Sequence, residues 1–329
     1  MENTTITAID GLLAGHATDE EHCTGCTAIL CPEGFTPGFA LPGFAPGTRE
    51  TDLLRPECTV DAVHGLLLAG GSAFGLAAAD GVMRYLRERG KGFVMPQAVI
   101  PLVPGAAIYD LDMNRRPGLL PDAGMGYAAA AAASSAPLPL GSLGAGRGAR
   151  CGRLYSRADL PEELNPTSKA GLGSWLVERQ GIKVAALVVL NALGDVHDPD
   201  SGAWLAGGRD PQGRPLGREA MLACLAGDSL PPSNTVLTAL ATNVPLGKVQ
   251  ATRLARMAGS GLARCIRPAH LAYDGDAVFA LAARQPLGRE AGPWSESLLG
   301  AMGQEAVARA AVLAVTGSSL SDQALTAII

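Results

Sequence analysis

The sequence predicts a mixed α/β protein in which stacked sheets carry helices on their outer faces. The chain has 329 residues, 47% of them hydrophobic and 17% charged, which is ample for a large packed core. Segments of strand and helix character do not alternate strictly, which favours stacked sheets over a doubly wound parallel sheet. Length alone would suggest roughly two domains. A single α/β sandwich of this size is ordinary, and we expect one domain over residues 1–329.

The first third of the chain is expected to contain a strand, a loop and a helix. Residues 23–31 have strand character, and residues 34–50 are rich in glycine and proline, which predicts an irregular loop. An apolar segment over residues 60–69 ends at Gly70-Gly71-Ser72. Residues 73–89 then show amphipathic helical spacing with cations near the end, where they suit the helix dipole.

The middle of the chain holds the segment with the strongest strand character. Residues 183–190 are mostly Val, Ala and Leu, and an asparagine ends the run. Before them, residues 99–111 are expected to contain a strand with Tyr109-Asp110 at its end, and residues 127–133 an alanine-rich helix. After them, residues 194–217 are rich in Gly, Pro and Asp and are expected to form the most exposed loop.

The last third of the chain is expected to hold three helices and two strands. No internal repeat of fixed period is present. The expected elements are a helix over 219–225, a strand beginning at Thr235 and running to 241, a helix over 247–263, a strand over 277–281 and a helix over 295–315.

Charge and hydropathy argue against nucleic-acid-binding and membrane-spanning classes of protein. The net charge is −5, the 26 Lys and Arg residues are scattered, and only 4% of residues are aromatic, so a nucleic-acid surface is not expected. The N-terminus has no basic and apolar signal-peptide pattern. The longest apolar stretch, residues 66–83, is interrupted by Asp80 and glycines, so no membrane span is expected. We therefore expect a cytoplasmic protein with no membrane partner.

The seven cysteines leave one metal hypothesis open. Cys23 and Cys26 form half of a zinc-knuckle spacing, with His22 and Cys31 nearby, but no second pair has the required spacing. Small buried thiols in a reducing compartment are the favoured interpretation. We expect no metal and no cofactor.

The polar run Ser233-Asn234-Thr235 is the most informative feature for chemistry. It follows two prolines and leads directly into an apolar strand. A threonine hydroxyl is a poor nucleophile, but an N-terminal threonine has its own α-amine, with a pKa of about 8, as a base. Releasing that amine requires cleavage of the Asn234–Thr235 bond by an N-to-O acyl shift followed by ester hydrolysis. The alternative is an asparagine cap and a threonine that opens an ordinary strand.

Other polar residues could complete a site around Thr235. Asp274 and Asp276, separated by one glycine, point to the same side if extended and could orient the threonine amine or hold a proton. A solvated turn is the alternative. Asn191 could donate to an oxyanion, as could Tyr109, and each could equally be an ordinary strand-end residue.

Two further groups are candidates for substrate binding. Backbone amides of Gly70, Gly71 and Ser72 could hold an anionic or carbonyl group, although the glycine spacing fits neither a dinucleotide site nor a P-loop. Arg153 or Arg147 could bind a carboxylate, but a surface arginine is the alternative for each. His270 could act as a base; a structural histidine is favoured.

Several segments together resemble one family, in the family's order and over nearly the whole chain. This is the P1 peptidase family, the group of D-aminopeptidase/β-aminopeptidase-like enzymes that includes nylon-oligomer hydrolase. The segments are Pro46-Gly47-Thr48-Arg49-Glu50-Thr51, Leu68-Ala69-Gly70-Gly71-Ser72-Ala73-Phe74-Gly75-Leu76, Ala107-Ile108-Tyr109-Asp110, Val188-Val189-Leu190-Asn191, Asn234-Thr235, Ile266-Arg267-Pro268-Ala269-His270 and Asp274-Gly275-Asp276.

The resemblance implies an αββα sandwich of the N-terminal-nucleophile type that matures by self-cleavage. It implies that Thr235 is the nucleophile and new N-terminus, that Asp274 and Asp276 are the catalytic pair of the nylon hydrolase type, and that Asn191 and Tyr109 belong to the site. Three departures touch the pocket. Arg153 stands where the nylon hydrolase has Lys, and Val236 and Leu271 each replace a frequent Thr.

The expected function is therefore a self-processing amidohydrolase or aminopeptidase. We expect cleavage into residues 1–234 and 235–329, and hydrolysis of small peptides or ω-amino amides through an acyl-enzyme on Thr235. Processed heterodimers are expected to assemble into a homo-oligomer. Two alternatives remain open: an acyltransferase with the same nucleophile, similar to ornithine acetyltransferases, and an unprocessed small-molecule binding protein.

Overall fold

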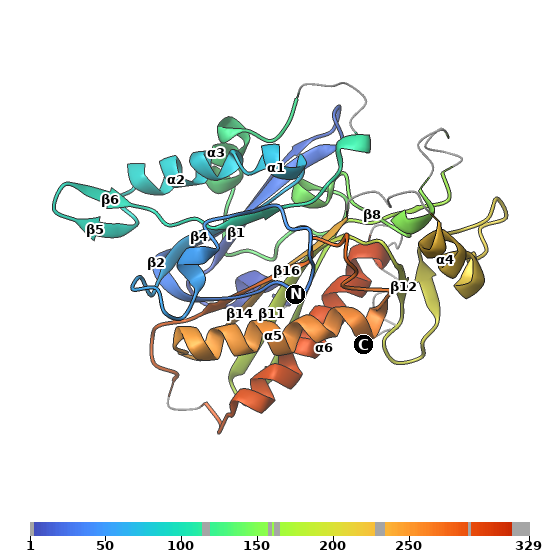
Figure 1. Cartoon of the computed structure of the whole chain (residues 1–329). Coiled ribbons are helices and arrows are strands. Elements are labelled where there is room, and N and C mark those ends of the chain that lie inside the picture. Colours follow the sequence, from blue (N-terminus) through green and yellow to red (C-terminus); the bar gives the residue numbers. More distant parts are fainter. Residues whose placement is uncertain are drawn as a thin grey trace.

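Two sheets lie face to face, and helices cover both outer faces (Figure 1). The computed structural model describes residues 3–113, 119–156, 160, 165–227, 234–288 and 291–317. Helices α2 and α3 cover one sheet, and α5 and α6 cover the other. This arrangement confirms the predicted sandwich of stacked sheets with outer helices.

The two layers share one long strand, β2 (Thr24–Ala40). Its first part pairs with β1 (Leu13–Asp19) and β4 (Val63–Ala69), and its last part pairs with β16 (Ala277–Ala282). The register shifts between Leu30 and Phe35, where the strand passes from one layer to the other.

The central strands of the second layer are those that carry the candidate site. Strands β11 (Ile182–Asn191) and β14 (Thr235–Thr242) are antiparallel, and β14 runs parallel to β16. The remaining strands are β3 (Thr48–Arg49), β5 (Phe93–Met95), β6 (Ala98–Ile100), β7 (Gly105–Ala107), β8 (Arg150–Cys151), β9 (Ser168–Lys169), β10 (Leu172–Arg179), β12 (Asp195–His197), β13 (Trp204–Ala206) and β15 (Ile266–Arg267).

The helices overlap the segments that were expected to be helical. They are α1 (Ser72–Gly75), α2 (Ala78–Glu88), α3 (Ala123–Ala131), α4 (Gly217–Ala226), α5 (Lys248–Cys265) and α6 (Glu296–Thr316), with short 3₁₀ turns at Ile6–Ala8, Asp52–Leu54, Leu111–Met113, Gly144–Gly146 and Arg153–Tyr155. By length and composition α6 could also cross a membrane, but 67% of its apolar window is buried inside the protein. It packs against α5, β10 and β11.

Strand alternation divides most of the core into three clusters of buried side chains. In β11, Leu187 and Val189 face the space between the sheets, whereas Val188 and Leu190 face α5 and α6. Successive strand side chains point to opposite faces, so one strand contributes to two cores. A third cluster fills the space between β2, β4 and the α2–α3 pair.

Three expectations for secondary structure were wrong in part. Residues 34–40 continue β2 instead of opening a loop, although residues 41–47 are irregular. The helix expected over 73–89 is interrupted between α1 and α2. The exposed loop expected over 194–217 contains β12 and β13, because Asp195 and Val196 pair with β15.

Candidate active site

The site lies where three neighbouring strands of the second layer begin or end. Thr235 is the first residue of β14 and pairs across the sheet with Asn191, the last residue of β11. Asn234 forms a parallel bridge with Asp274, just before β16. The side chains of Asn191 and Asn234 are fully buried, and Thr235 is 3% exposed. The fold thus brings together residues from 191 to 274.

The peptide bond before Thr235 is held by two hydrogen-bond donors. The Thr235 hydroxyl donates to the carbonyl oxygen of Asn234 over 2.6 Å. The Gly275 amide donates to the same oxygen over 2.7 Å. A Cβ atom on Gly275 would lie 2.5 Å from the Thr235 hydroxyl, so only glycine lets this loop approach the threonine so closely. Ser233 and the two prolines before it lie outside the described residues.

The two aspartates are buried, in contrast to the alternative of a solvated turn. Asp276 accepts a hydrogen bond from the Val236 amide over 2.7 Å and contacts His270 Nδ1 at 2.8 Å. Asp274 accepts one from the Leu271 amide over 2.6 Å. Both residues are at most 3% exposed. They are therefore fixed on either side of the glycine that reaches Thr235.

Burial and mutual repulsion set the protonation of this cluster. Burial, together with the neighbouring charge of Asp276, raises the pKa of Asp274 to about 7. Burial alone would lower the pKa of His270, but its hydrogen bond to Asp276 and the charges of both aspartates outweigh this and raise it. A carboxyl group that titrates near neutrality is suited to proton transfer.

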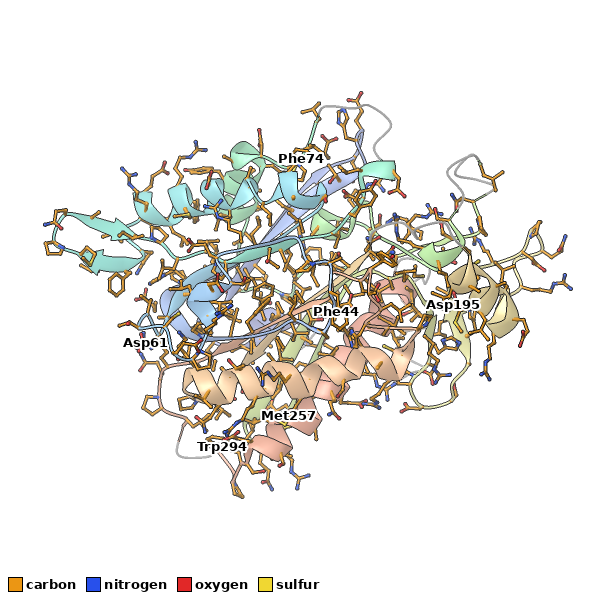
Figure 2. All side chains as sticks on the ribbon, in the orientation of Figure 1. Phe44, Asp61, Phe74, Asp195, Met257 and Trp294 are labelled. Carbon is orange, nitrogen blue, oxygen red and sulfur yellow. The ribbon has the colours of Figure 1, made fainter. Side chains whose placement is uncertain are left out.

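The segment over residues 43–45 closes the loop of the aspartates from outside. The amides of Phe44 and Ala45 donate to the carbonyl oxygen of Asp274, and the Gly43 amide donates to that of Asp276. The ring of Phe44 is 74% exposed (Figure 2). Sequence reasoning assigned this Gly/Pro-rich stretch to an irregular loop and did not connect it with the site. No local signal connects positions 43–45 with 274–276.

Asn191 is in the site, but the structure shows one of its amide donors engaged elsewhere. Its Nδ2 donates to the Tyr109 carbonyl over 2.9 Å, and its Oδ1 accepts from the Arg150 amide. An asparagine amide carries two N–H donors, so the second can serve an oxyanion. The Tyr109 backbone is tied to the site through this bond, and its ring lies 5.9 Å from the Arg153 guanidinium carbon.

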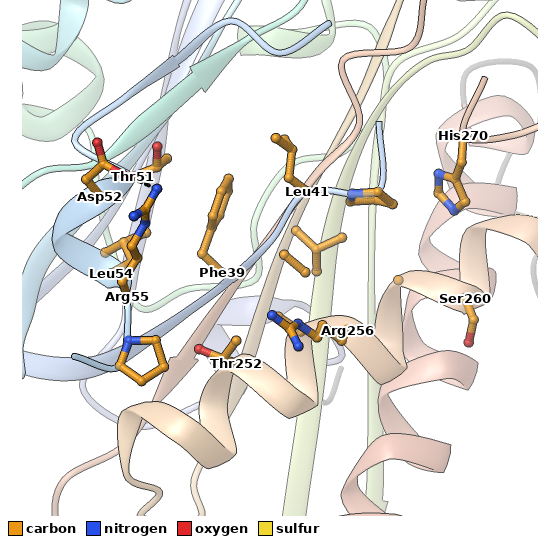
Figure 3. A pocket seen from close by; sticks show the side chains of 16 residues that line it. Phe39, Leu41, Thr51, Asp52, Leu54, Arg55, Thr252, Arg256, Ser260 and His270 are labelled. Atoms are coloured by element: carbon orange, nitrogen blue, oxygen red, sulfur yellow. Dashed lines mark ion pairs between the residues drawn. The ribbon is translucent and has the colours of Figure 1, made fainter. Parts of the chain in front are cut away.

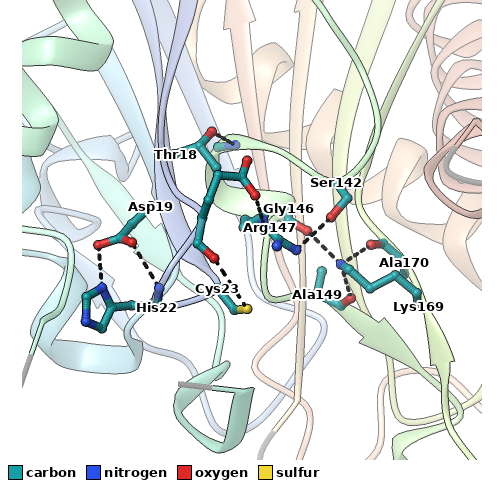
Figure 4. Close-up of polar contacts among 12 residues, drawn as sticks. Thr18, Asp19, His22, Cys23, Ser142, Gly146, Arg147, Ala149, Lys169 and Ala170 are labelled. Carbon is teal, nitrogen blue, oxygen red and sulfur yellow. Dashed lines mark hydrogen bonds and ion pairs between the residues drawn. The ribbon is translucent and has the colours of Figure 1, made fainter. Parts of the chain in front are cut away.

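Arg153 is the buried cation of the site, which excludes the surface alternative for this residue. Its side chain is 1% exposed. Nε donates to the Asn234 side-chain oxygen over 2.6 Å, and Nη2 pairs with Asp112 at 2.8 Å. It therefore holds the residue immediately before Thr235. Arg147 instead pairs with Glu20 away from this cluster (Figure 4).

The backbone amides of Gly70, Gly71 and Ser72, which could have held an anionic or carbonyl group of a substrate, donate to acceptors within the protein instead. The Gly71 amide donates to Asp110 Oδ1 over 2.6 Å, and Thr24 donates to Asp110 Oδ2 over 2.9 Å. The amides of Gly70 and Ser72 donate to the carbonyls of Gly25 and Ile108. The positive φ of Gly71 and Ser72, 79° and 54°, permits this wrap around Asp110. Any substrate contact there must come from other atoms.

Lys169 anchors the glycine-rich segment that leads to Arg153 (Figure 4). Its ammonium group donates to the carbonyls of Gly146, Ala149 and Ala170 at 3.3, 2.9 and 2.6 Å. Burial lowers the pKa of Lys169 to about 7. Sequence reasoning missed this residue, because a lysine beside a short strand carries no sign of its contacts.

The zinc hypothesis finds no support in the geometry. His22 pairs with Asp19 at 2.9 Å, and Cys31 donates to the Val63 carbonyl. Cys26 is buried in the α2–α3 core. Within the part of the chain that the structure describes, no three His, Cys, Asp or Glu side chains converge as metal ligands. All seven cysteines are free thiols.

Comparison with known proteins identifies one family over nearly the whole chain. The model of peptidase family S58 matches residues 4–325. A Mycobacterium bovis protein described as an uncharacterized aminopeptidase is 40% identical over 293 residues, covering 84% of this chain and 80% of the relative. The 6-aminohexanoate-oligomer endohydrolase of a Kocuria strain is 31% identical over 280 residues, covering 82% and 72%.

Solved structures give the fold. The L-aminopeptidase D-Ala-esterase/amidase of Ochrobactrum anthropi, described as a variant of the Ntn hydrolase fold, matches with a TM-score of 0.66 at 19% identity, covering 94% of this chain and 85% of that chain. A β-aminopeptidase of Burkholderia matches with a TM-score of 0.62 at 20% identity, covering 95% and 86%. The predicted family resemblance is thus confirmed. The chain belongs to peptidase family S58, and it is an amide-bond hydrolase with the Ntn hydrolase fold.

Proposed function

We propose that the protein is a self-processing amidohydrolase in which Thr235 is both the agent of cleavage and the mature nucleophile. The observation that supports this best is the geometry at the Asn234 carbonyl: the Thr235 hydroxyl, which is the attacking group, lies 2.6 Å from the carbonyl oxygen, and the Gly275 amide donates to that oxygen over 2.7 Å. A backbone amide placed on a carbonyl oxygen stabilises the negative charge that develops there when the hydroxyl attacks.

Self-cleavage would begin with attack of the Thr235 hydroxyl oxygen on the Asn234 carbonyl carbon. Asp274, whose pKa is raised to about 7, takes the hydroxyl proton, and the Gly275 amide holds the oxyanion. The carbon–nitrogen bond then breaks, the Thr235 nitrogen takes a proton, and an ester links Asn234 to the threonine oxygen. Water hydrolyses this ester and leaves the Asn234 carboxylate and a free threonine hydroxyl and amine.

The same hydroxyl would then attack substrate amides. The free α-amine accepts the hydroxyl proton, and an acyl-enzyme forms on Thr235 as the amine product leaves. The second Nδ2 hydrogen of Asn191 would support the oxyanion. The buried aspartate pair would attract a substrate ammonium. Small peptides or ω-amino amides fit this site, in agreement with relatives named aminopeptidase and 6-aminohexanoate-oligomer endohydrolase.

Intact mass under denaturing conditions tests the proposal on fresh and aged protein. Two fragments that meet at the Asn234–Thr235 bond are expected, and Thr235→Ala should give one persistent mass and no amide hydrolysis. Thr4→Ala is the matched control, because Asn3–Thr4 is another Asn–Thr bond of this chain. An unprocessed wild-type chain, or an active Thr235→Ala variant in a clean preparation, would contradict the mechanism.

We further propose that the processed protein assembles with copies of itself in the reducing cytoplasm. The β5–β6 hairpin exposes Phe93, Val94, Met95 and Ile100, between 41% and 75% of each. Contiguous exposed apolar side chains mark contact surfaces. Val94→Asp should lower the molar mass measured by light scattering, and an unchanged mass would contradict the role of this hairpin.

A further inference from the structure

A cavity lies on the outer side of the second sheet, between α5 and the chain that follows β2 (Figure 3). Its volume is about 670 Å³, within the range of about 300–1,000 Å³ typical of small-molecule sites. Phe39, Leu41, Leu54, Ala255 and Val278 line it. Thr235, Asp274 and Asp276 do not line it, and His270 is the residue of the aspartate cluster that does.

Arg256, which lines this cavity, has no carboxylate partner among the described residues, whereas the two other arginines of the same helix each have one. Helix α5 carries three arginines. Arg253 pairs with Glu296 and Arg264 with Glu305, both on α6. Arg256 projects from the same helix toward the cavity, and no carboxylate among the described residues pairs with it (Figure 3). A guanidinium beside apolar walls is the arrangement that recognises a carboxylate with an apolar body.

A buried hydroxyl in the cavity wall points independently to a polar ligand. Thr252 lies one turn before Arg256 on α5, and its side chain lines the cavity. The residue is 8% exposed, and its hydroxyl has no hydrogen-bond partner in the described part of the protein. Buried polar groups are nearly always hydrogen-bonded, so an unpartnered one beside a cavity calls for a ligand atom.

The far end of the cavity connects it with the aspartate pair. His270 lines the cavity, and its Nδ1 contacts Asp276 at 2.8 Å. The Gly259 carbonyl of α5 is a second acceptor for the ring. At the opposite end Arg55 is neutralised by Asp52 at 2.8 Å. The uncompensated charge facing the cavity is therefore positive.

We propose that this cavity is a binding site for a small carboxylate with an apolar body, held by Arg256 and Thr252 and communicating with the catalytic pair through His270. The carboxylate pairs with the guanidinium and accepts a hydrogen bond from the Thr252 hydroxyl, while the body packs against Phe39 and Val278. An anion there stabilises the protonated imidazole of His270. The communication through His270 rests on the proposed function, whereas the binding of a carboxylate in the cavity does not.

Calorimetry with 4-phenylbutyrate, carried out on the Thr235→Ala protein, tests binding without any turnover. Arg256→Gln should weaken binding by about tenfold or more, because a charge-assisted pair is lost. Arg253→Gln is the matched control on the same helix and should bind as the parent does. The uncharged analogue 4-phenylbutanol should bind at least about tenfold more weakly. Equal binding of the acid and the alcohol, or no effect of Arg256→Gln, would overturn the proposal.

Dilution and NMR separate the remaining outcomes. If a second copy of the chain occupied the cavity, 4-phenylbutyrate would bind only after dilution to the monomer, and this result would also overturn the proposal. The ligand should raise the pKa of His270, whose signal is assigned from a His270→Gln variant, because its carboxylate adds negative charge near an imidazole that already faces Asp274 and Asp276. Binding should correspondingly weaken as pH rises and His270 loses its proton. If the pKa of His270 is the same with and without the ligand, the proposed communication between the cavity and the aspartate pair is wrong.

Discussion

At the scale of single residues, Gly275 is a position where the site leaves no room for a side chain. Its amide donates to the Asn234 carbonyl, and an added Cβ would lie 2.5 Å from the Thr235 hydroxyl and 2.7 Å from the Ala45 carbonyl oxygen. Gly275→Ala should therefore displace the hydroxyl and slow self-cleavage by about a hundredfold, the cost of a misplacement of about 1 Å. The rate of fragment appearance by mass spectrometry checks this.

Gly288→Ala is the control for that experiment, because no atom lies within 4 Å of the added carbon. Its processing rate should match the wild type. A Gly275→Ala protein that processes at the wild-type rate would show that the approach of this loop to Thr235 is not required.

Asp274 gives stability a pH dependence of definite sign. Its pKa is raised to about 7, compared with about 3.9 in an unfolded chain. The folded state therefore holds a proton that the unfolded state releases, and this contribution to stability is lost as pH rises from about 4 to 7. In the Thr235→Ala background, Asp274→Asn, which resembles the protonated form, should raise Tm more at pH 8 than at pH 5.

Asp10→Asn provides the comparison for this measurement, because it removes a carboxylate from an exposed position and should change Tm little. A Tm gain for Asp274→Asn that is the same at pH 5 and pH 8 would mean that Asp274 is not the group that titrates.

At the scale of elements, the sequence predicted those with a clear period and missed those that depend on close packing. The end of β11 at Asn191 and the helical spacing of α5 and α6 were visible as patterns. The continuation of β2 through residues 34–40 was not, because glycine and proline normally signal a loop. Gly38 is in the strand because the α5 backbone packs directly on it.

Gly38→Ala tests that packing. The added Cβ would lie 2.2 Å from the Ala251 carbonyl carbon, so the strand or α5 must shift. Overpacking of this kind should lower the free energy of unfolding by about 1–3 kcal/mol, measured by urea denaturation.

Gly259→Ala is the matched change on the other side of the same interface. Its Cβ would meet Val278 at an ordinary 3.4 Å, and a helical alanine is favoured over glycine by about 0.5–1 kcal/mol. This variant should be as stable as the wild type or more so. Equal losses in both variants would contradict the role of close approach at Gly38.

At the scale of the whole molecule, the sequence named most of the residues that meet in the site but not how they meet. Thr235, Asn191 and the aspartates converge because β11, β14 and β16 are neighbours, an order that no local pattern encodes. The resemblance to a family supplied that convergence. The Gly275 amide, the contact of Arg153 with Asn234 and the histidine behind Asp276 came only from the three-dimensional structure.

The same strand order predicts the fate of the two fragments that the proposed cleavage would give. Strand β14, which would become N-terminal, lies between β11 of the first fragment and β16 of its own, and β16 pairs in turn with β2. Helix α6 packs on β10 and β11, and α5 packs on β2, so both helices of the second fragment cover strands of the first. Separation would expose both the inter-sheet core and the helix-covered core to water. Each Å² of apolar surface exposed in this way costs about 25 cal/mol of free energy. Residues 1–234 and 235–329 should therefore elute together in size-exclusion chromatography without denaturant and separate only when unfolded. Independent elution of two folded fragments in native buffer would contradict the shared sheet.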